Sequence, residues 1–440
     1  MIAMRARRDR MTGQALPLAL LLAAAIAVMW RHLHEVGTTA AARTQLTHVA
    51  DAAAYSGAVV QARGLNLLAT MNRAQVAHQV AMAHLATLAS WAQFGAAQAE
   101  RGGRGNPPSV LIGMLFGPSY ATGYSAARAA RSFGSLSQPG GGFAQAQARH
   151  EETVHVILEQ ARHAVANDLG RARDAAIAAV LAANYAATTG EPSFTVNDDT
   201  LPGKLVHHGA SPRGDLRAVV ELAVSPYGFL ASRQDTARNP WPVSRQCPWL
   251  RHELRRRGDT RFGLDGRWQA HDTLSFHALR SNRRIGCYFR EYAMGWGRVS
   301  VRDGEPPGFV FHDDPPPDFS EQDFWRWVSA ATDWGLLDGR DNRLANSYAV
   351  LRGSRWAARG LPGFTDLRRQ GDGAQSLSFG LRVVLSMPGK GAGGVSAVTV
   401  HSAAQTDFLR PGRRADGRHE LPNLFHPYWQ ARLRESGEPA

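Results

Sequence analysis

The sequence predicts an α+β protein in which an N-terminal transmembrane helix continues into a long helical hairpin or small bundle, followed by an extracytoplasmic mixed α+β domain. Three observations predict this class. An uncharged apolar stretch lies near the start, two long proline-free segments keep helical spacing, and short alternating segments separated by turn residues begin near residue 190. The expected regions are a cytoplasmic basic tail (1–10), a transmembrane anchor (11–30), a helical region (31–189) and an extracytoplasmic α+β domain (190–440).

The anchor is the segment from Met11 to Trp30, which carries no charged residue. Twenty helical residues span about 30 Å, the thickness of the hydrocarbon core of a bilayer. Four arginines precede the segment: Arg5, Arg7, Arg8 and Arg10. Because an excess of basic residues stays cytoplasmic, we expect a single-pass protein with a cytoplasmic N-terminus and its C-terminal bulk outside the cytoplasm.

Two other readings of this segment remain open. A cleaved signal peptide has the same basic start and apolar middle, but its apolar region is usually shorter and ends in small residues, whereas this one ends in Trp30-Arg31-His32. A buried core helix is the third reading, and an uncharged stretch of this length behind an arginine cluster argues against it. The sequence therefore favours an uncleaved anchor.

The basic composition does not indicate a nucleic-acid partner. The formal net charge is +13, but the arginines are scattered and only Lys204 and Lys390 are lysines. The tightest basic run is Arg255-Arg256-Arg257, and no stripe of basic residues interleaved with aromatic ones occurs. We therefore expect contact with membrane lipid and no binding of nucleic acid.

Two cysteines, Cys247 and Cys287, are the only ones in the chain. Outside the cytoplasm they are expected to form one disulfide, and two unpaired buried thiols are the alternative.

The helical region is predicted from its spacing. Thr38 to Arg101 contains no proline, and a second long helix is expected from Ala144 to Ala187. Small or apolar residues recur every seven positions in the first segment, in two rows, the second of which contains both Gly57 and Gly64. Such a row of small residues lets another helix approach closely.

The C-terminal half is predicted to mix strands and helices. The expected strands are Leu216–Val224, Leu274–Leu279, Tyr288–Val301, Leu377–Leu385 and Val395–His401. The expected helices are Phe319–Trp334 and Ser347–Arg359.

No catalytic, cofactor-binding or metal-binding motif stands out in the sequence. The chain has no Gly-x-Ser-x-Gly, no His-Glu-x-x-His and no complete phosphate-binding loop. His207 and His208 are adjacent, so on a strand they point to opposite faces and make poor co-ligands. We therefore expect a protein that is not an enzyme and that carries no cofactor.

Two segments carry a family resemblance. Gly13 and Gln14 open the apolar span, and Ala50, Asp51, Ala52 and Ala53 follow it in a small-residue helix. This arrangement resembles the N-terminal module of the Tad (Flp pilus-assembly, TadE/TadG-like) proteins. Near the other end, Glu420 to Leu433 resembles the C-terminus of longer, uncharacterised members of that group.

The resemblance implies a single-pass protein of the bacterial inner membrane, with its C-terminal bulk in the periplasm, that assists assembly or anchoring of a Tad/Flp-type pilus or a related secretion machine. It would act by protein–protein contacts with other anchored pilus-assembly or secretion proteins, and a homo-oligomer is left open. Leu18 stands where pilins carry a glutamate counted from the glycine, so the resemblance does not extend to pilin processing. The alternatives are a membrane-anchored structural scaffold unrelated to pili and, less favoured, an envelope-polymer hydrolase.

Overall fold

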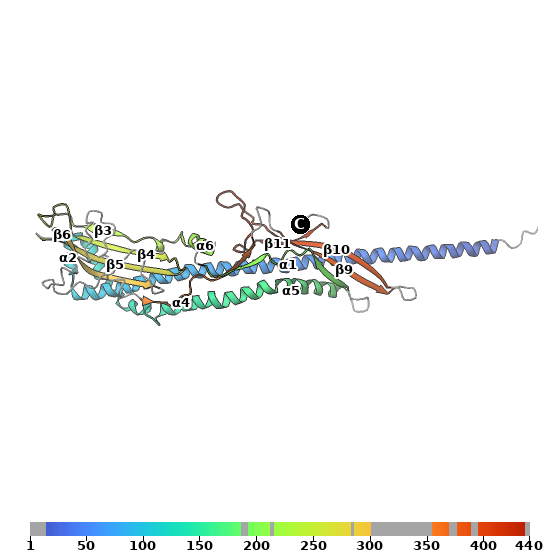
Figure 1. Cartoon of the computed structure of the whole chain (residues 1–440), viewed down its shortest axis with the longest axis horizontal. Coiled ribbons are helices and arrows are strands. Elements are labelled where there is room, and N and C mark those ends of the chain that lie inside the picture. Colours follow the sequence, from blue (N-terminus) through green and yellow to red (C-terminus); the bar gives the residue numbers. More distant parts are fainter. Residues whose placement is uncertain are drawn as a thin grey trace, which may run out of the picture. The chain divides into compact units, whose positions relative to one another are not determined.

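The computed structural model describes residues 15–185, 192–211, 215–282, 286–300, 354–368, 376–388 and 395–435. It has the mixed α+β class that the sequence predicts, with a long apolar N-terminal helix and β-sheets after it (Figure 1). The residues group into two compact units that each combine helices with strands. The first unit contains Met1–Ala69, Val165–Val206 and Leu367–Ala440, and the second contains Thr70–Ala164 and His207–Asp366.

The described helices begin with α1, Ala15–Arg104, a single helix of 90 residues that continues without a break through Gly37. The predicted second long helix is a continuous helical run in which α4 and α5 flank the π-helical turn η2. The remaining helices are short. In chain order the elements after α1 are α2 (Ser109–Phe116), α3 (Pro118–Ala126), η1 (Ala127–Ser137), α4 (Gly142–Glu152), η2 (Thr153–Ile157), α5 (Leu158–Asn184), α6 (Asp215–Val224) and η3 (Gly228–Leu230).

The described strands form three sheets, with orders β1-β9-β10-β11, β2-β8 and β3-β4-β5-β6-β7. The four-stranded sheet is antiparallel throughout, and in the five-stranded sheet only β7 pairs in parallel with its neighbour. The strands are β1 (Ser193–Asn197), β2 (Leu205–His208), β3 (Asp235–Arg238), β4 (Glu253–Phe262), β5 (Trp268–Asn282), β6 (Gly286–Ser300), β7 (Ser354–Arg355), β8 (Phe364–Leu367), β9 (Leu377–Pro388), β10 (Val395–Phe408) and β11 (Trp429–Arg434).

One predicted strand is wrong. Leu216–Val224 lies in the helix α6, because its buried residues Leu216, Val220 and Val224 recur every four positions and so share one helical face. The helix expected at Ser347–Arg359 is also wrong over its described part, which contains the short strand β7 followed by irregular chain. The helix expected at Phe319–Trp334 and the end of the strand expected at Val301 lie outside the described residues.

In the first unit, α5 packs antiparallel along α1, and the two helices run side by side in Figure 1. Gly57 faces Ile177, and a Cβ at position 57 would lie only 2.9 Å from Ile177 Cγ1. About two helical turns further along α1, a Cβ at Gly64 would overlap Leu169 Cδ1. The small-residue row predicted to admit another helix is thus covered at these positions by a helix of the same chain.

The core of the first unit lies between the two helices and the four-stranded sheet. Five alternating residues of β9, from Leu377 to Leu385, are almost fully buried, as expected for a strand with one covered face, and the last four of them belong to the core of the first unit. They pack with alanines of α1 and with large side chains of α5 in one cluster that includes Ala50, Ala53, Ile177, Leu181, Phe379, Leu381, Val383 and Leu385.

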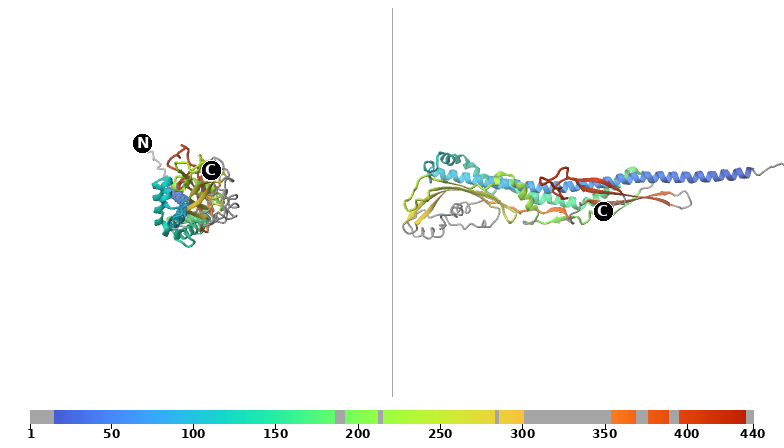
Figure 2. Two further views of the ribbon diagram at one scale, coloured as in Figure 1. Left: turned by 90° about the vertical axis from the view of Figure 1, so that its left-hand side faces the viewer. Right: turned by 90° about the horizontal axis from the view of Figure 1, so that it is seen from above.

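The second unit is built on the five-stranded sheet, whose long strands curve visibly in Figure 2. Residues of α2 pack on one part of this sheet, where Ile112 and Leu115 contact the cluster of Phe276 and Met294. On β6, Gly297 lies so close to α1 that a Cβ there would overlap the carbonyl oxygen of Ser90. A glycine is therefore needed for the strand to reach the helix.

Gly64→Ala is expected to destabilise the first unit by about 1–3 kcal/mol, because the added methyl group overlaps the buried Leu169. Gly170→Ala on α5 is the matched control. Nothing lies within 4 Å of a Cβ at Gly170, so alanine should stabilise the helix by roughly 0.5–1 kcal/mol. Urea unfolding of the detergent-solubilised full-length chain measures both effects.

Leu169→Ala removes a buried side chain and is itself destabilising, but it makes room for the methyl group at position 64. The Gly64→Ala/Leu169→Ala variant should therefore lose less stability than the sum of the losses of the two single variants. Equal stability of the Gly64→Ala and Gly170→Ala variants would show that the two helices do not approach as described.

Candidate functional site

The first candidate feature is the exposed apolar start of α1. This helix contains an 18-residue window that is long and apolar enough to cross a membrane, and none of that window is buried. Leu16, Trp30 and Val36 are 72%, 74% and 67% exposed. A core helix would be covered by other elements, whereas this window presents apolar side chains on all sides. Residues 11–14 of the predicted anchor lie outside the described part of the chain.

The second feature is the anchor motif singled out in the sequence, Gly13, Gln14 and Ala50 to Ala53. Gly13 and Gln14 lie outside the described residues. Ala50 and Ala53 are fully buried on the face of α1 that meets α5 and the four-stranded sheet, while Ala52 is exposed. Asp51 accepts a hydrogen bond from Ser402 Oγ on β10, at 2.7 Å. In this structure the segment therefore joins α1 to the sheet of the first unit.

The C-terminal segment Glu420 to Leu433 also attaches to α1. Asn66 Nδ2 donates to the carbonyl oxygen of Trp429, and the amide of Trp429 donates to Asn66 Oδ1, both at 2.9 Å. The Trp429 side chain is buried, and its indole Nε1 donates to the carbonyl oxygen of Asn423 at 3.2 Å. Within the same segment, His426 Nε2 lies 2.9 Å from Glu420 Oε1. The segments around Asp51 and Trp429 thus both contribute contacts inside the first unit.

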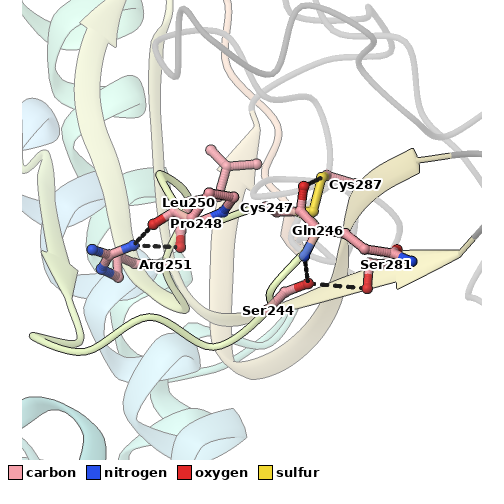
Figure 3. Close-up of a disulfide and its surroundings, with 8 residues drawn as sticks. All are labelled: Ser244, Gln246, Cys247, Pro248, Leu250, Arg251, Ser281 and Cys287. Atoms are coloured by element: carbon pink, nitrogen blue, oxygen red, sulfur yellow. Dashed lines mark hydrogen bonds between the residues drawn. A yellow bond between two sulfur atoms is a disulfide. The ribbon is translucent and has the colours of Figure 1, made fainter.

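The two cysteines form a disulfide in the second unit, between the loop that precedes β4 and the start of β6 (Figure 3). Their Cα atoms are 6.2 Å apart, within the usual range for a disulfide. Cys247 is fully buried in a small cluster with Leu279 and Phe289. Close by, Ser244 Oγ hydrogen-bonds Ser281 Oγ at 3.1 Å.

A buried charge network ties the five-stranded sheet of the second unit to α1. Asp272 is fully buried on β5, and its Oδ1 accepts from Arg233 Nε at 2.8 Å and from Arg256 Nη2 at 2.7 Å. Its Oδ2 accepts from Ser90 Oγ on α1 at 2.7 Å. The guanidinium of Arg256 lies 3.9 Å from the ring centroid of Phe94, and burial lowers the pKa of this arginine. Arg233, Arg256 and Ser90 all belong to the second unit, so the network links its sheet to the α1 residues of the same unit.

A pair of histidines lies between α1 and α4. His78 Nδ1 and His150 Nδ1 are 2.6 Å apart. Burial lowers the pKa of both side chains, and the charge of His150 lowers that of His78 further, so the pair is neutral near pH 7 and shares one N–H···N hydrogen bond.

A third cluster brings together residues that the sequence analysis did not connect. Glu159 and His163 lie one turn apart on α5, and His207 lies on β2. One ligand atom from each residue falls within 4.8 Å of the other two. Glu159 Oε1 is 3.5 Å from His163 Nε2 and 3.9 Å from His207 Nε2. All three side chains are partly exposed, so solvent reaches the cluster.

Arg162 lies beneath this cluster and is fully buried. Its Nη1 donates to His207 Nδ1 at 2.9 Å and to Thr365 Oγ1 at 3.0 Å, and its Nη2 is 3.2 Å from Glu159 Oε1. Burial and the charge of Arg162 lower the pKa of His207, in that order, so this histidine is neutral near pH 7.

The expectation that His207 and His208 are poor co-ligands agrees with the geometry. His208 stacks on Phe364 with ring centroids 4.7 Å apart, while His207 turns toward α5. The signal that sequence reasoning missed was a glutamate and a histidine four residues apart, which places both on one face of a helix.

No family model matches the chain, and neither a curated protein nor a solved structure matches it.

Replacing both cysteines with serine is expected to lower the free energy of unfolding by about 4 kcal/mol, because the disulfide closes a loop with a sequence separation of 40 residues. Reducing agent should destabilise the wild-type chain to a similar extent and leave the Cys247→Ser/Cys287→Ser variant unchanged. Urea unfolding with and without reductant measures this. Two titratable thiols in the unfolded, unreduced protein would contradict the pairing.

Proposed function

We propose that this chain is a single-pass protein of the bacterial inner membrane that assists assembly or anchoring of a Tad/Flp-type pilus or a related secretion machine through protein–protein contacts. The observation that carries the proposal is the uncovered apolar window of α1. The window continues as one helix into a folded unit, where Ala50 and Ala53 of the Tad-like segment lie on the buried face of α1. Membrane lipid is the solvent that such a window fits.

The arginines ahead of the window and the disulfide support the same orientation. Arg5, Arg7, Arg8 and Arg10 favour a cytoplasmic N-terminus. Disulfides form and persist in oxidising compartments, so the bond between Cys247 and Cys287 favours a periplasmic location for the second unit.

In this proposal, the packing of α1 limits the surface of the helix to which partner proteins can bind. Around Gly57 and Gly64 the small-residue face is already occupied by α5. Other anchored helices would therefore contact the exposed window between Leu16 and Val36, where apolar side chains have no partner within the described part of the first unit.

The anchor is tested by the variant Leu22→Arg/Ala25→Arg. Two arginines near the centre of the span cost about 5–7 kcal/mol of insertion free energy, so the variant should leave the membrane fraction after an alkaline carbonate wash while the wild type stays in it. Ala52→Arg, at an exposed position of the same helix, is the matched control and should remain bound. A periplasm-dependent reporter fused after Ala440 should be active. Activity only of a cytoplasm-dependent reporter would overturn the orientation.

The assembly role is tested by deleting the gene in its host and counting surface pili, with adhesion and secretion as further readouts. We expect fewer pili, restored by the wild-type gene and not by the Leu22→Arg/Ala25→Arg variant. Unchanged pili, adhesion and secretion in the deletion strain would contradict the role and favour an anchored scaffold unrelated to pili.

A further inference from the structure

The geometry points to a zinc-binding site formed by Glu159, His163 and His207. This site is independent of the proposed role in pilus assembly, because it rests only on residues of the second unit and on their side-chain chemistry.

The donor set is one that zinc prefers. Two imidazoles and one carboxylate are a common three-ligand set for zinc, with the fourth position left to water. Ligands in a tetrahedral site with bonds of about 2.0–2.1 Å lie roughly 3.3 Å from one another. The observed spacings of 3.5 Å from Glu159 Oε1 to His163 Nε2 and 3.9 Å to His207 Nε2 are only slightly wider. The ligand atoms of His163 and His207 lie within 4.8 Å of each other, so side-chain rotations that draw the two imidazoles together complete the set.

The backbone holds the ligands in place. Glu159 and His163 are fixed by the four-residue spacing on α5, a helix with no proline or break between them. His207 belongs to β2, which pairs with β8, and its ring packs close to Gly363, where a Cβ would lie 2.9 Å from His207 Cε1. The ring centroids of His163 and His207 are 4.5 Å apart. Helix and strand thus present the three side chains at one partly exposed place.

Arg162 sets the affinity of the site. Its Nη1 donates to His207 Nδ1, so the neutral histidine carries its proton on Nε2, the atom that faces Glu159. A zinc ion on Nε2 requires this proton to sit on Nδ1 instead, and Arg162 must then give up that hydrogen bond. Its Nη1 keeps a second acceptor in Thr365 Oγ1 at 3.0 Å. Since most zinc-bound histidines have an acceptor behind them and this one has a cation, we expect weaker binding than at a structural zinc site.

The test uses the full-length chain in detergent, purified without a polyhistidine tag and stripped of metal with a chelator. Cobalt(II) is the spectroscopic probe, and zinc is the competitor. We expect one equivalent of cobalt to produce a saturable visible absorption band, which one equivalent of zinc removes.

The His163→Gln and His207→Gln variants should lose cobalt binding by more than the roughly 10–100-fold that substitution of an outer-shell partner costs. Both side chains are about two-fifths exposed, so the variants should fold, and far-ultraviolet circular dichroism checks this. His208→Gln is the matched control: it removes the adjacent histidine, which stacks on Phe364, and should bind cobalt as the wild type does.

Three results would overturn the site. The first is the absence of a saturable band in the wild type. The second is a band of equal strength in the folded His163→Gln and His207→Gln variants, and the third is a loss in His208→Gln as large as that in His207→Gln.

Discussion

Asparagine and glutamine side chains of helix α1 form hydrogen bonds with backbone groups of the segments that cover it. The packing of both units around α1 depends on these hydrogen bonds. In the first unit Gln61 donates to the carbonyl oxygen of Leu377, and Asn66 pairs with both backbone groups of Trp429. In the second unit Asn72 donates to the carbonyl oxygen of Thr365 at 2.8 Å. A buried backbone group without a partner costs about 1–3 kcal/mol, and an amide side chain offers both a donor and an acceptor. A purely apolar helix face could cover a core but could not hold strand ends and loops in register.

Small residues make these short amides effective. The side chain of an asparagine or glutamine reaches a neighbouring backbone only when helix and strand lie close together. Gly297 provides that closeness between β6 and α1 in the second unit, while Gly64 lets the helix α5 approach α1 in the first. Alanines at positions such as 50 and 53 continue the thin face within the first unit. Along α1, small residues let neighbouring elements approach, and asparagine and glutamine side chains form hydrogen bonds with the backbone groups of those elements.

The long helices could be predicted because helical spacing without proline persists over dozens of residues. The disulfide could be anticipated because the chain has only two cysteines. The seven-residue spacing of small residues predicts that a helix packs against Gly57 and Gly64. It does not distinguish a helix of the same chain from a helix of another protein, since both fit such a row equally well. The prediction of a strand at Leu216–Val224 was wrong because the valines of this segment favour a strand, whereas Leu216, Val220 and Val224 recur every four positions, as in a helix. The cluster around His207 escaped notice because folding brings that strand to α5 from a distant part of the sequence.

The continuity of α1 has a mechanical meaning. Thr38 to Ser56 contains neither glycine nor proline, the usual sites of helix kinks, and the helix runs through Gly37 without interruption. The exposed window and the buried face around Ala50 and Asp51 are therefore two parts of one continuous helix. Rotation or tilt of the window turns the alanine face and the Asp51–Ser402 contact with it. A movement of the apolar end therefore changes the position of the sheet of the first unit directly, because no flexible segment of α1 lies between them.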